Sequence, residues 1–247
     1  MRVALFVPCY IEQFYPEVAI ATLQILEKAG CQVDYPINQT CCGQPMGNSG
    51  YEKDAQSCMN LFIENFSGYD YIVAPSGSCV LFVKEHYHRL EEKEKSEHVR
   101  SRIYELCEFL TDIIKVRSLQ ARFPYKVGVH ESCHAQRGLR LSQASELNLP
   151  YFSKINTLLA MVDGLQLVDL ERKDECCGFG GTFCISEEAV SVKMGQDRIK
   201  DHERGGAEVI TATDMSCLMH LDGILKRQKK SIPVIHIAQI LNGAELK

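Results

Sequence analysis

Hydrophobic and polar positions along this chain alternate between strand-like and helix-like periods. Short apolar runs such as 3–7 and 71–74 are typical of strands buried in a parallel sheet, and the segment 31–35 is also expected to be a strand. The periodic stretch 18–26 lies between the strands at 3–7 and 31–35 and leads to Ala29-Gly30, a common helix stop. Alternation of this kind predicts an α/β fold with mostly parallel strands.

The same alternation extends through the rest of the chain. It predicts helices at 52–66, after Cys79, and at 99–116, 153–162, 185–203 and 215–227, and strands at 126–130, 165–169 and 207–211. The segment Arg122-Phe123-Pro124-Tyr125 is the expected boundary. We therefore expect two domains, 1–121 and 122–247.

Three landmarks recur in the same order in both predicted domains. A strand running into a cysteine appears twice, then Cys-Cys-Gly appears twice, then a second strand leads to a further cysteine. The paired positions are Cys9 and Cys133, Cys41-Cys42-Gly43 and Cys176-Cys177-Gly178, and Cys79 and Cys217. The sequence thus predicts two tandem α/β repeats related by a pseudo-two-fold.

The cysteines of each repeat come directly after predicted strands. Because the carboxyl ends of parallel strands share one edge of a sheet, four sulfurs that are distant in sequence can meet there. The candidate ligands are Cys9, Cys41, Cys42 and Cys79 in the first repeat, and Cys133, Cys176, Cys177 and Cys217 in the second. Gly43 and Gly178 give the backbone the freedom to turn two adjacent cysteines toward one centre.

The number of cysteines itself favours metal or redox chemistry. The chain has 12 cysteines in 247 residues, and its five-residue N-terminal apolar run is too short for a secretory signal, so the expected compartment is the cytoplasm. A reducing cytoplasm disfavours structural disulfides. Four thiolates per repeat suit a [4Fe-4S] cluster or a closed zinc site, and the spacing matches neither a ferredoxin run nor the usual zinc pairs.

Composition excludes some partners. A net charge of −5 and the mixing of basic with acidic residues leave no basic face for nucleic acid. No stretch approaches the roughly 20 apolar residues of a membrane span, so no direct membrane insertion is expected. A nucleotide site is also excluded, because Gly178-Phe179-Gly180-Gly181 lacks the dinucleotide spacing and no phosphate-loop lysine motif occurs.

On these motifs the chain resembles the cysteine-rich CCG-domain family, which includes the CCG-containing subunit of heterodisulfide reductase and the iron-sulfur subunit of glycolate oxidase. The resemblance covers essentially the whole chain and rests on 41–45, 75–79 and 176–183. It is strongest toward the small iron-sulfur subunits of bacterial L-lactate dehydrogenase complexes. It implies two tandem CCG domains, one or two iron-sulfur clusters, and operation beside a larger ferredoxin-like iron-sulfur subunit and a third subunit.

The resemblance implies one leading function, and two alternative functions stay open. The leading interpretation is an electron-transfer subunit of a complex that oxidises L-lactate or a related 2-hydroxy acid. The alternatives are a cluster-based thiol-disulfide reductase subunit and a zinc-stabilised scaffold without redox activity. The fullest family pattern closes each motif with Cys-x-x-Cys, whereas this chain has Ser76 and Asp214 at those first cysteine positions. A five-cysteine centre is therefore not supported, and zinc in one site stays open.

The remaining candidates have ordinary structural explanations beside the functional ones. Cys31, Cys58 and Cys107 are expected in the core, and His236 is expected to be an interior histidine. For Cys184, ligation and core packing are equally supported. For His134 and Arg137, a role beside cluster sulfur or a carboxylate substrate competes with a place in a surface turn.

Overall fold

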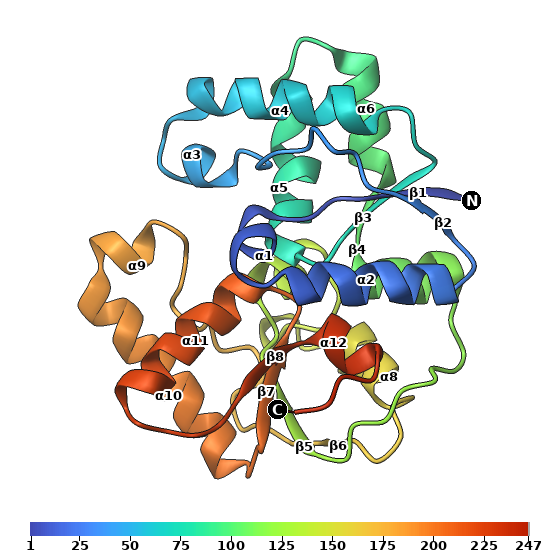
Figure 1. Ribbon diagram of the computed structural model, residues 1–247. Helices are drawn as coiled ribbons and strands as arrows, with labels where there is room; N and C mark the ends of the chain where they lie inside the picture. The colour runs from blue at the N-terminus through green and yellow to red at the C-terminus, as the bar shows by residue number, and fades with distance from the viewer. Residues whose placement is uncertain (247) are drawn as a thin grey trace. The chain divides into compact units, whose positions relative to one another are not determined.

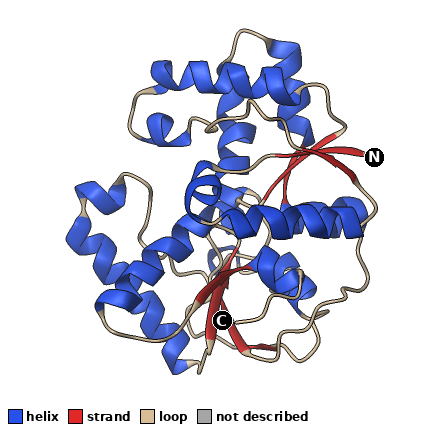
Figure 2. Cartoon of the chain, viewed as in Figure 1, coloured by secondary structure: helices blue, strands red, loops and turns tan. Residues whose placement is uncertain are grey.

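A computed structural model describes residues 1–246 of the chain. The chain divides into two compact units, Met1–Ile114 and the remainder from Lys115. Each unit has its own four-stranded sheet among the described residues, drawn in red in Figure 2 with helices in blue.

Unit 1 alternates strands and helices around the sheet β2-β1-β3-β4, in which every pairing is parallel. Figure 1 labels these four strands. The strands are β1 (Arg2–Leu5), β2 (Gln32–Asp34), β3 (Tyr71–Ala74) and β4 (Ile103–Glu105). The helices are α1 (Cys9–Phe14), α2 (Pro16–Lys28), α3 (Gln44–Asn48), α4 (Glu52–Phe66), α5 (Gly77–His86), η1 (Tyr87–Arg89), α6 (Lys93–Arg102), α7 (Leu106–Glu108) and the π-helix η2 (Phe109–Ile114).

Unit 2 repeats this topology in the parallel sheet β6-β5-β7-β8. Its strands are β5 (Lys126–Val129), β6 (Gln166–Leu167), β7 (Val209–Ala212) and β8 (Val234–His236). Its helices are the π-helix η3 (His134–Gly138), η4 (Ser145–Leu147), α8 (Lys154–Leu159), α9 (Phe183–Ser186), α10 (Glu188–Arg204), α11 (Met215–Arg227) and α12 (Ile237–Leu241).

Equivalent positions in the two units follow from strand register. Val3 pairs with Tyr71 between β1 and β3, and Val127 pairs with Val209 between β5 and β7. The backbone N-H of the residue after each first strand donates to β3 or β7 in the same way, from Phe6 to Val73 and from His130 to Thr211. The repeat found in the sequence is thus a repeat of structure.

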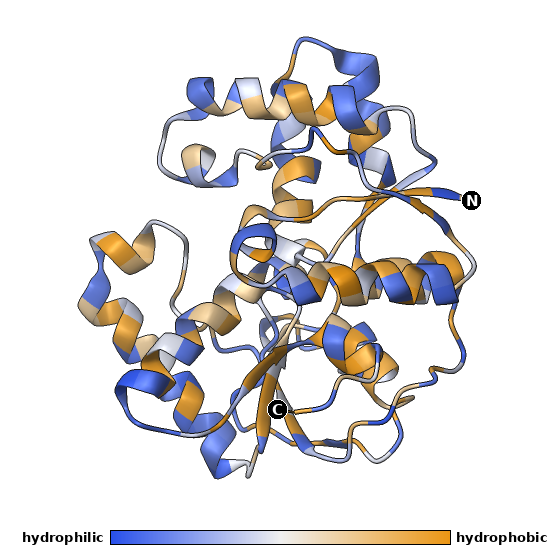
Figure 3. Ribbon diagram, viewed as in Figure 1, coloured by the Kyte–Doolittle hydropathy of each residue, from blue (hydrophilic) through white to orange (hydrophobic). Residues whose placement is uncertain are grey.

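Burial explains why these segments form strands and helices. The central strands β3 and β7 are almost wholly buried, as parallel strands covered on both faces must be. Helix α2 has a buried stripe that includes Val18, Ile25 and Leu26, and its hydrophobic and hydrophilic residues alternate in Figure 3. The predicted α/β class with parallel sheets is confirmed.

One predicted element is wrong. The apolar stripe at 99–116 predicts one long helix, but the chain leaves helix α6 at Arg102 and forms the edge strand β4 before α7 and η2. Ile103 and Glu105 pair with β3, so completing the sheet outweighs helix propensity. The Glu105 carboxylate then caps α7 in a capping box.

Two expectations about the arrangement stay predictions: the domain limits 1–121 and 122–247, and the pseudo-two-fold relation between the repeats.

Among the helices of residues 1–246, none combines the length and apolar content needed to cross a lipid bilayer.

An aromatic cluster supports the sheet of unit 1 from the side of α4. The Phe6 ring meets the rings of Phe62 and Phe66 edge-on, with centroids 4.8 and 5.8 Å apart. All three side chains are buried. Edge-to-face aromatic pairs add to the stability gained by burying the rings.

We predict that Phe62→Ala lowers the free energy of unfolding by about 3–5 kcal/mol, because it leaves a cavity in this cluster. The matched control is Ile20→Ala on α2, where the side chain is 54 % exposed, and its effect should stay within about 0.5 kcal/mol. Urea denaturation measures both variants. Equal destabilisation by the two would show that the aromatic cluster contributes little.

Candidate metal centres

The four candidate cysteines of unit 1 converge at the carboxyl edge of its sheet. Cys9 follows β1 and opens α1, while Cys79 lies in the first turn of α5 after β3. Cys41 and Cys42 lie in the loop after β2. The sheet order reverses direction between β1 and β3, the position where open α/β sheets hold their ligands.

The thiols of this group contact one another in series. The Cys9 thiol donates to Cys41 Sγ at 4.0 Å. Cys41 also interacts with Cys42, and Cys42 in turn interacts with Cys79. Cys42 and Cys79 are buried, whereas Cys9 and Cys41 are half-buried. The four sulfurs thus form one continuous group.

The loop that carries the adjacent cysteines is held in an unusual conformation. Gly43 has φ +90°, in the left-handed region that glycine adopts readily. Its backbone N-H donates to Cys41 Sγ at 3.4 Å. The Tyr87 hydroxyl donates to the Cys42 carbonyl oxygen at 2.9 Å, so the loop is also fixed from the C-terminal end of α5.

Unit 2 builds the same arrangement from its own residues. Cys133 interacts with Cys176, Cys176 with Cys177, and Cys177 with Cys217. These four cysteines follow β5, β6 and β7, with Cys217 in the first turn of α11. The structure therefore brings together all four predicted thiols in each unit.

The second Cys-Cys-Gly loop admits no side chain at its glycine. Gly178 has φ +87°, and its N-H donates to Cys176 Sγ at 3.4 Å. A Cβ there would lie 2.6 Å from the Ser191 carbonyl oxygen of α10. The Ser191 hydroxyl donates to the Gly178 carbonyl oxygen at 2.7 Å. Glycine is thus required both by conformation and by close packing.

Hydrogen bonding separates the thiol pKa values within each group. Interactions from Cys42 and Cys9 lower the pKa of Cys41 to about 3. Interactions from Cys133 and Cys177 lower the pKa of Cys176 to about 2. The pKa values of Cys9 and Cys133 rise, first because each donates to its neighbouring thiolate and then through burial. Each group therefore already favours one thiolate, the form that binds metal.

The two positions that depart from the fullest family pattern are helix caps. Ser76 is the N-cap of α5, and its hydroxyl accepts from the Cys79 backbone N-H at 3.3 Å. Asp214 is the N-cap residue of α11, is buried, and accepts a hydrogen bond from the Ser132 hydroxyl. Cys79 and Cys217 thus sit where helix N-termini stabilise negative sulfur.

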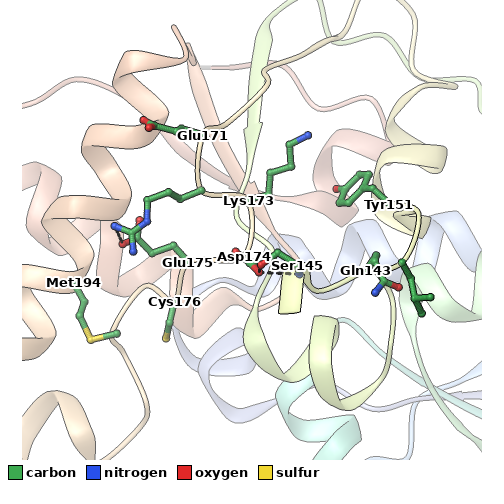
Figure 4. Close-up of a pocket in the computed structure, with 11 residues that line it drawn as sticks. Gln143, Ser145, Tyr151, Glu171, Lys173, Asp174, Glu175, Cys176 and Met194 are labelled. Atoms are coloured by element: carbon green, nitrogen blue, oxygen red, sulfur yellow. Dashed lines mark hydrogen bonds and ion pairs between the residues drawn. The ribbon is translucent and has the colours of Figure 1, made fainter. Parts of the chain in front are cut away.

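A cavity of about 680 Å³ in unit 2 reaches the second thiol group. In Figure 4, Cys176 and Met194 lie on one side of it and Gln143 and Tyr151 on the other. The basic groups in its wall are paired: Arg172 with Glu175 at 2.6 Å, and Lys173 with Asp169 at 2.7 Å. The cavity gives Cys176 access to solvent and to small molecules.

The other four cysteines are not members of the predicted ligand sets. Cys31 and Cys107 are buried, as expected for core residues, and Cys58 is half-buried on α4. Cys184 lies on α9, half-buried, and its thiol donates to the Gly181 carbonyl oxygen at 3.0 Å. All cysteines are free thiols in the described chain.

Three further candidates from the sequence have defined contacts. His134 Nδ1 lies 3.6 Å from Cys133 Sγ. The Arg137 guanidinium pairs with Glu146 at 2.6 Å and with Asp174 at 3.5 Å, so it is engaged by carboxylates of the protein. His236 is buried and caps α12 in a capping box, a structural role.

Sequence reasoning missed one residue at the second centre. His130 is 1 % exposed, and its ligand atom lies within 4.8 Å of the Cys177 and Cys217 sulfurs. Burial, followed by the Arg198 charge, lowers the pKa of His130 to about 3. The sequence contains one signal that could have identified His130 as a site residue. It lies three residues before Cys133, at the end of a predicted strand.

The donor chemistry fits a thiolate-bound metal. Eight thiols in two groups of four, with a histidine beside the second group, are ligands for iron-sulfur clusters or zinc. The chain contributes the sulfur atoms and the backbone N-H groups of Gly43 and Gly178 that donate to them. Such hydrogen bonds orient the ligands of a bound metal and adjust its affinity.

We predict that metal-free, reduced protein is alkylated by iodoacetamide at Cys41 and Cys176 before Cys9 and Cys133. With pKa values of about 3 and about 2, Cys41 and Cys176 are thiolates at neutral pH, so their rates should be flat between pH 8 and pH 6. An ordinary exposed thiol should slow about tenfold per pH unit. Peptide mass spectrometry measures the rates, and a matching slowdown at Cys41 and Cys176 would contradict the assignment.

Comparisons with known proteins agree with this geometry. The model of a cysteine-rich domain family, CCG, matches residues 3–84 and 127–222. Lactate utilization protein A from Shouchella clausii is 40% identical over 99% of this chain and 100% of that protein. Its counterpart from Bacillus subtilis is 38% identical over 98% of this chain and 100% of that protein.

A solved structure supports the fold alone. The crystal structure of a hypothetical protein from Helicobacter pylori has a TM-score of 0.58 at 14% identity, covering 97% of this chain and 48% of that one. The family match covers the cysteine-bearing part of each unit. The chain belongs to the cysteine-rich CCG domain family, with one matched segment in each unit.

Proposed function

We propose that this protein is an iron-sulfur electron-transfer subunit of a complex that oxidises L-lactate or a related 2-hydroxy acid. The observation that carries the proposal is the convergence of four thiols at the carboxyl edge of each sheet. The proposed ligands are Cys9, Cys41, Cys42 and Cys79 for one centre, and Cys133, Cys176, Cys177 and Cys217 for the other.

Thiol arrangement supports an iron-sulfur cluster, most simply one [4Fe-4S] in each unit, over zinc in both. Adjacent cysteines turned toward one point, as at Cys41-Cys42, suit ligation of an extended cluster, whereas structural zinc pairs are usually separated by two to four residues. When bound, such a cluster accepts and releases single electrons. Zinc in one of the two sites is the alternative occupant.

The chain's own residues would hold the negative charge of such a centre. Gly43 and Gly178 donate backbone N-H groups to sulfur at 3.4 Å. The N-termini of α5 and α11 point their partial positive charge at Cys79 and Cys217. Hydrogen bonds and dipoles of this kind stabilise the reduced form and so set the reduction potential.

The substrate assignment rests on the relatives. Proteins named lactate utilization protein A match this chain at 37–40% identity along nearly its full length. We extend lactate utilisation to this protein on that basis. Its proposed partners are a larger ferredoxin-like iron-sulfur subunit and a third subunit, and its proposed compartment is the cytoplasm, where thiols stay reduced.

One observation favours a second candidate function, thiol-disulfide reduction at the second centre. The cavity beside Cys176 is large enough for a small disulfide substrate. Two assays distinguish this candidate from lactate oxidation. Reduction of a heterodisulfide with dithionite as reductant, together with no oxidation of L-lactate, would favour thiol-disulfide reduction.

We predict that anaerobically purified protein contains iron and acid-labile sulfide, and that Cys42→Ser or Cys177→Ser each removes about half of the iron, because a serine hydroxyl is a poor replacement for thiolate. Loss should be confined to the unit that carries the substitution. Iron and sulfide analysis with electron paramagnetic resonance of the reduced protein measures both effects.

Cys58→Ser is the matched control, since Cys58 lies on α4 and belongs to neither predicted ligand set. Its iron content should equal that of the unaltered protein. Zinc without sulfide in the unaltered protein, or equal iron loss in the control, would refute the proposed function.

A further inference from the structure

The two units differ at one place beside their thiol groups. In unit 1 the aromatic cluster Phe6, Phe62 and Phe66 fills it. Strand register makes His130 the equivalent of Phe6. Buried positions on α4 and α10 share the same spacing, which makes Arg198 and His202 the equivalents of Phe62 and Phe66. A hydrophobic cluster in one unit therefore corresponds to a cluster of two histidines and an arginine in the other.

The polar cluster of unit 2 is fully buried. Arg198, His202 and His130 are at most 1 % exposed. Arg198 Nε donates to His202 Nε2 at 3.2 Å, and its Nη1 pairs with Asp201 at 3.3 Å. Gly128 on β5 leaves the space for the His202 ring, since a Cβ there would clash with it.

Burying two imidazole rings and a guanidinium is costly unless each has hydrogen-bond partners. Arg198 and His202 are joined by one hydrogen bond, but His130 Nδ1 and His202 Nδ1 both have no hydrogen-bond partner within residues 1–246. An ordinary interior histidine, such as His236, bonds through both ring nitrogens, here to Thr213 and Ala238. His130 and His202 thus each keep one ring nitrogen without a protein partner, and of the two it is His130 that is grouped with two of the thiols.

Two thiols of the second centre lie beside His130. The ligand atoms of His130, Cys177 and Cys217 all lie within 4.8 Å of one another, a spacing that one metal ion can bridge. His130 directly follows β5, so its ring is placed by the rigid sheet and by the His130 N-H bond to Thr211 at 2.7 Å. Phe6 offers no lone pair at the same place in unit 1.

We propose that His130 is a metal ligand of the second centre, so that unit 2 binds metal through imidazole and thiolate together while unit 1 binds through thiolates alone. The proposal deepens the proposed function, because it makes the two centres of one chain chemically different. Donor type and the nearby Arg198 charge both tune a bound cluster, so the two centres should differ in reduction potential.

The test uses cadmium as a probe, because it favours thiolate and imidazole donors and requires no cluster assembly. The full chain, metal-free and reduced, is labelled with nitrogen-15 only at histidine and loaded with cadmium-113. We expect two cadmium resonances, one of which shows one-bond coupling to a histidine nitrogen. Cadmium spectra in which neither resonance is coupled to nitrogen would overturn the proposal.

Two substitutions identify the histidine. His130→Phe places the unit 1 residue in unit 2 and should abolish the coupling, whereas the matched control His202→Phe should keep it. Coupling that survives His130→Phe, or that disappears only in His134→Asn, would also overturn the proposal. If His130→Phe does not fold, the coupling expected in the unaltered chain and its persistence in His134→Asn, His202→Phe and His220→Asn assign it to His130, since His220 also lies near Cys176 and Cys177.

The failure of this inference is separable from failure of the proposed function. Cadmium coupling reports the donor set whether or not the native metal is iron. Iron and sulfide analysis of the anaerobically purified protein reports the cluster whether or not a histidine binds it.

Discussion

Two adjacent thiols must face one point, and this constraint governs the structure around each centre. Successive side chains of an extended backbone point to opposite sides. The loops at Cys41-Cys42 and Cys176-Cys177 overcome this by turning at a glycine with positive φ, whose N-H returns to the first sulfur. In unit 2 the packing of α10 against Gly178 leaves no room for any other residue.

The parallel sheet supplies the remaining sulfurs to the same point. Cys9 and Cys79 follow β1 and β3, the strands between which the sheet order reverses, and Cys133 and Cys217 follow their counterparts β5 and β7. Even peripheral features recur, since Glu105 and His236 occupy equivalent register positions and both form capping boxes. The strands and loops that recur in both units thus fix the positions of the thiols. The side chains beside the thiols differ between the units.

Sequence alone predicts what depends on local pattern and strand order. The strands before Cys9 and Cys133, and the gathering of four thiols at a sheet edge, follow from apolar runs and parallel topology. The long helix at 99–116 was wrong because the edge strand β4 is defined by pairing with β3, which no local period reveals. Neither does the sequence reveal that α10 brings Arg198 and His202 beside His130, because that contact depends on tertiary packing.

If the proposed function is right, electrons from lactate pass through centres held by this chain. The most direct measurement is the reduction of its clusters by L-lactate in the complex isolated anaerobically with its natural partners, followed by rapid-freeze electron paramagnetic resonance. We expect the clusters to be reduced within one turnover, and a complex carrying Cys42→Ser and Cys177→Ser to lose lactate-dependent electron delivery to the acceptor. Unchanged delivery in that double variant would show that electrons take another route.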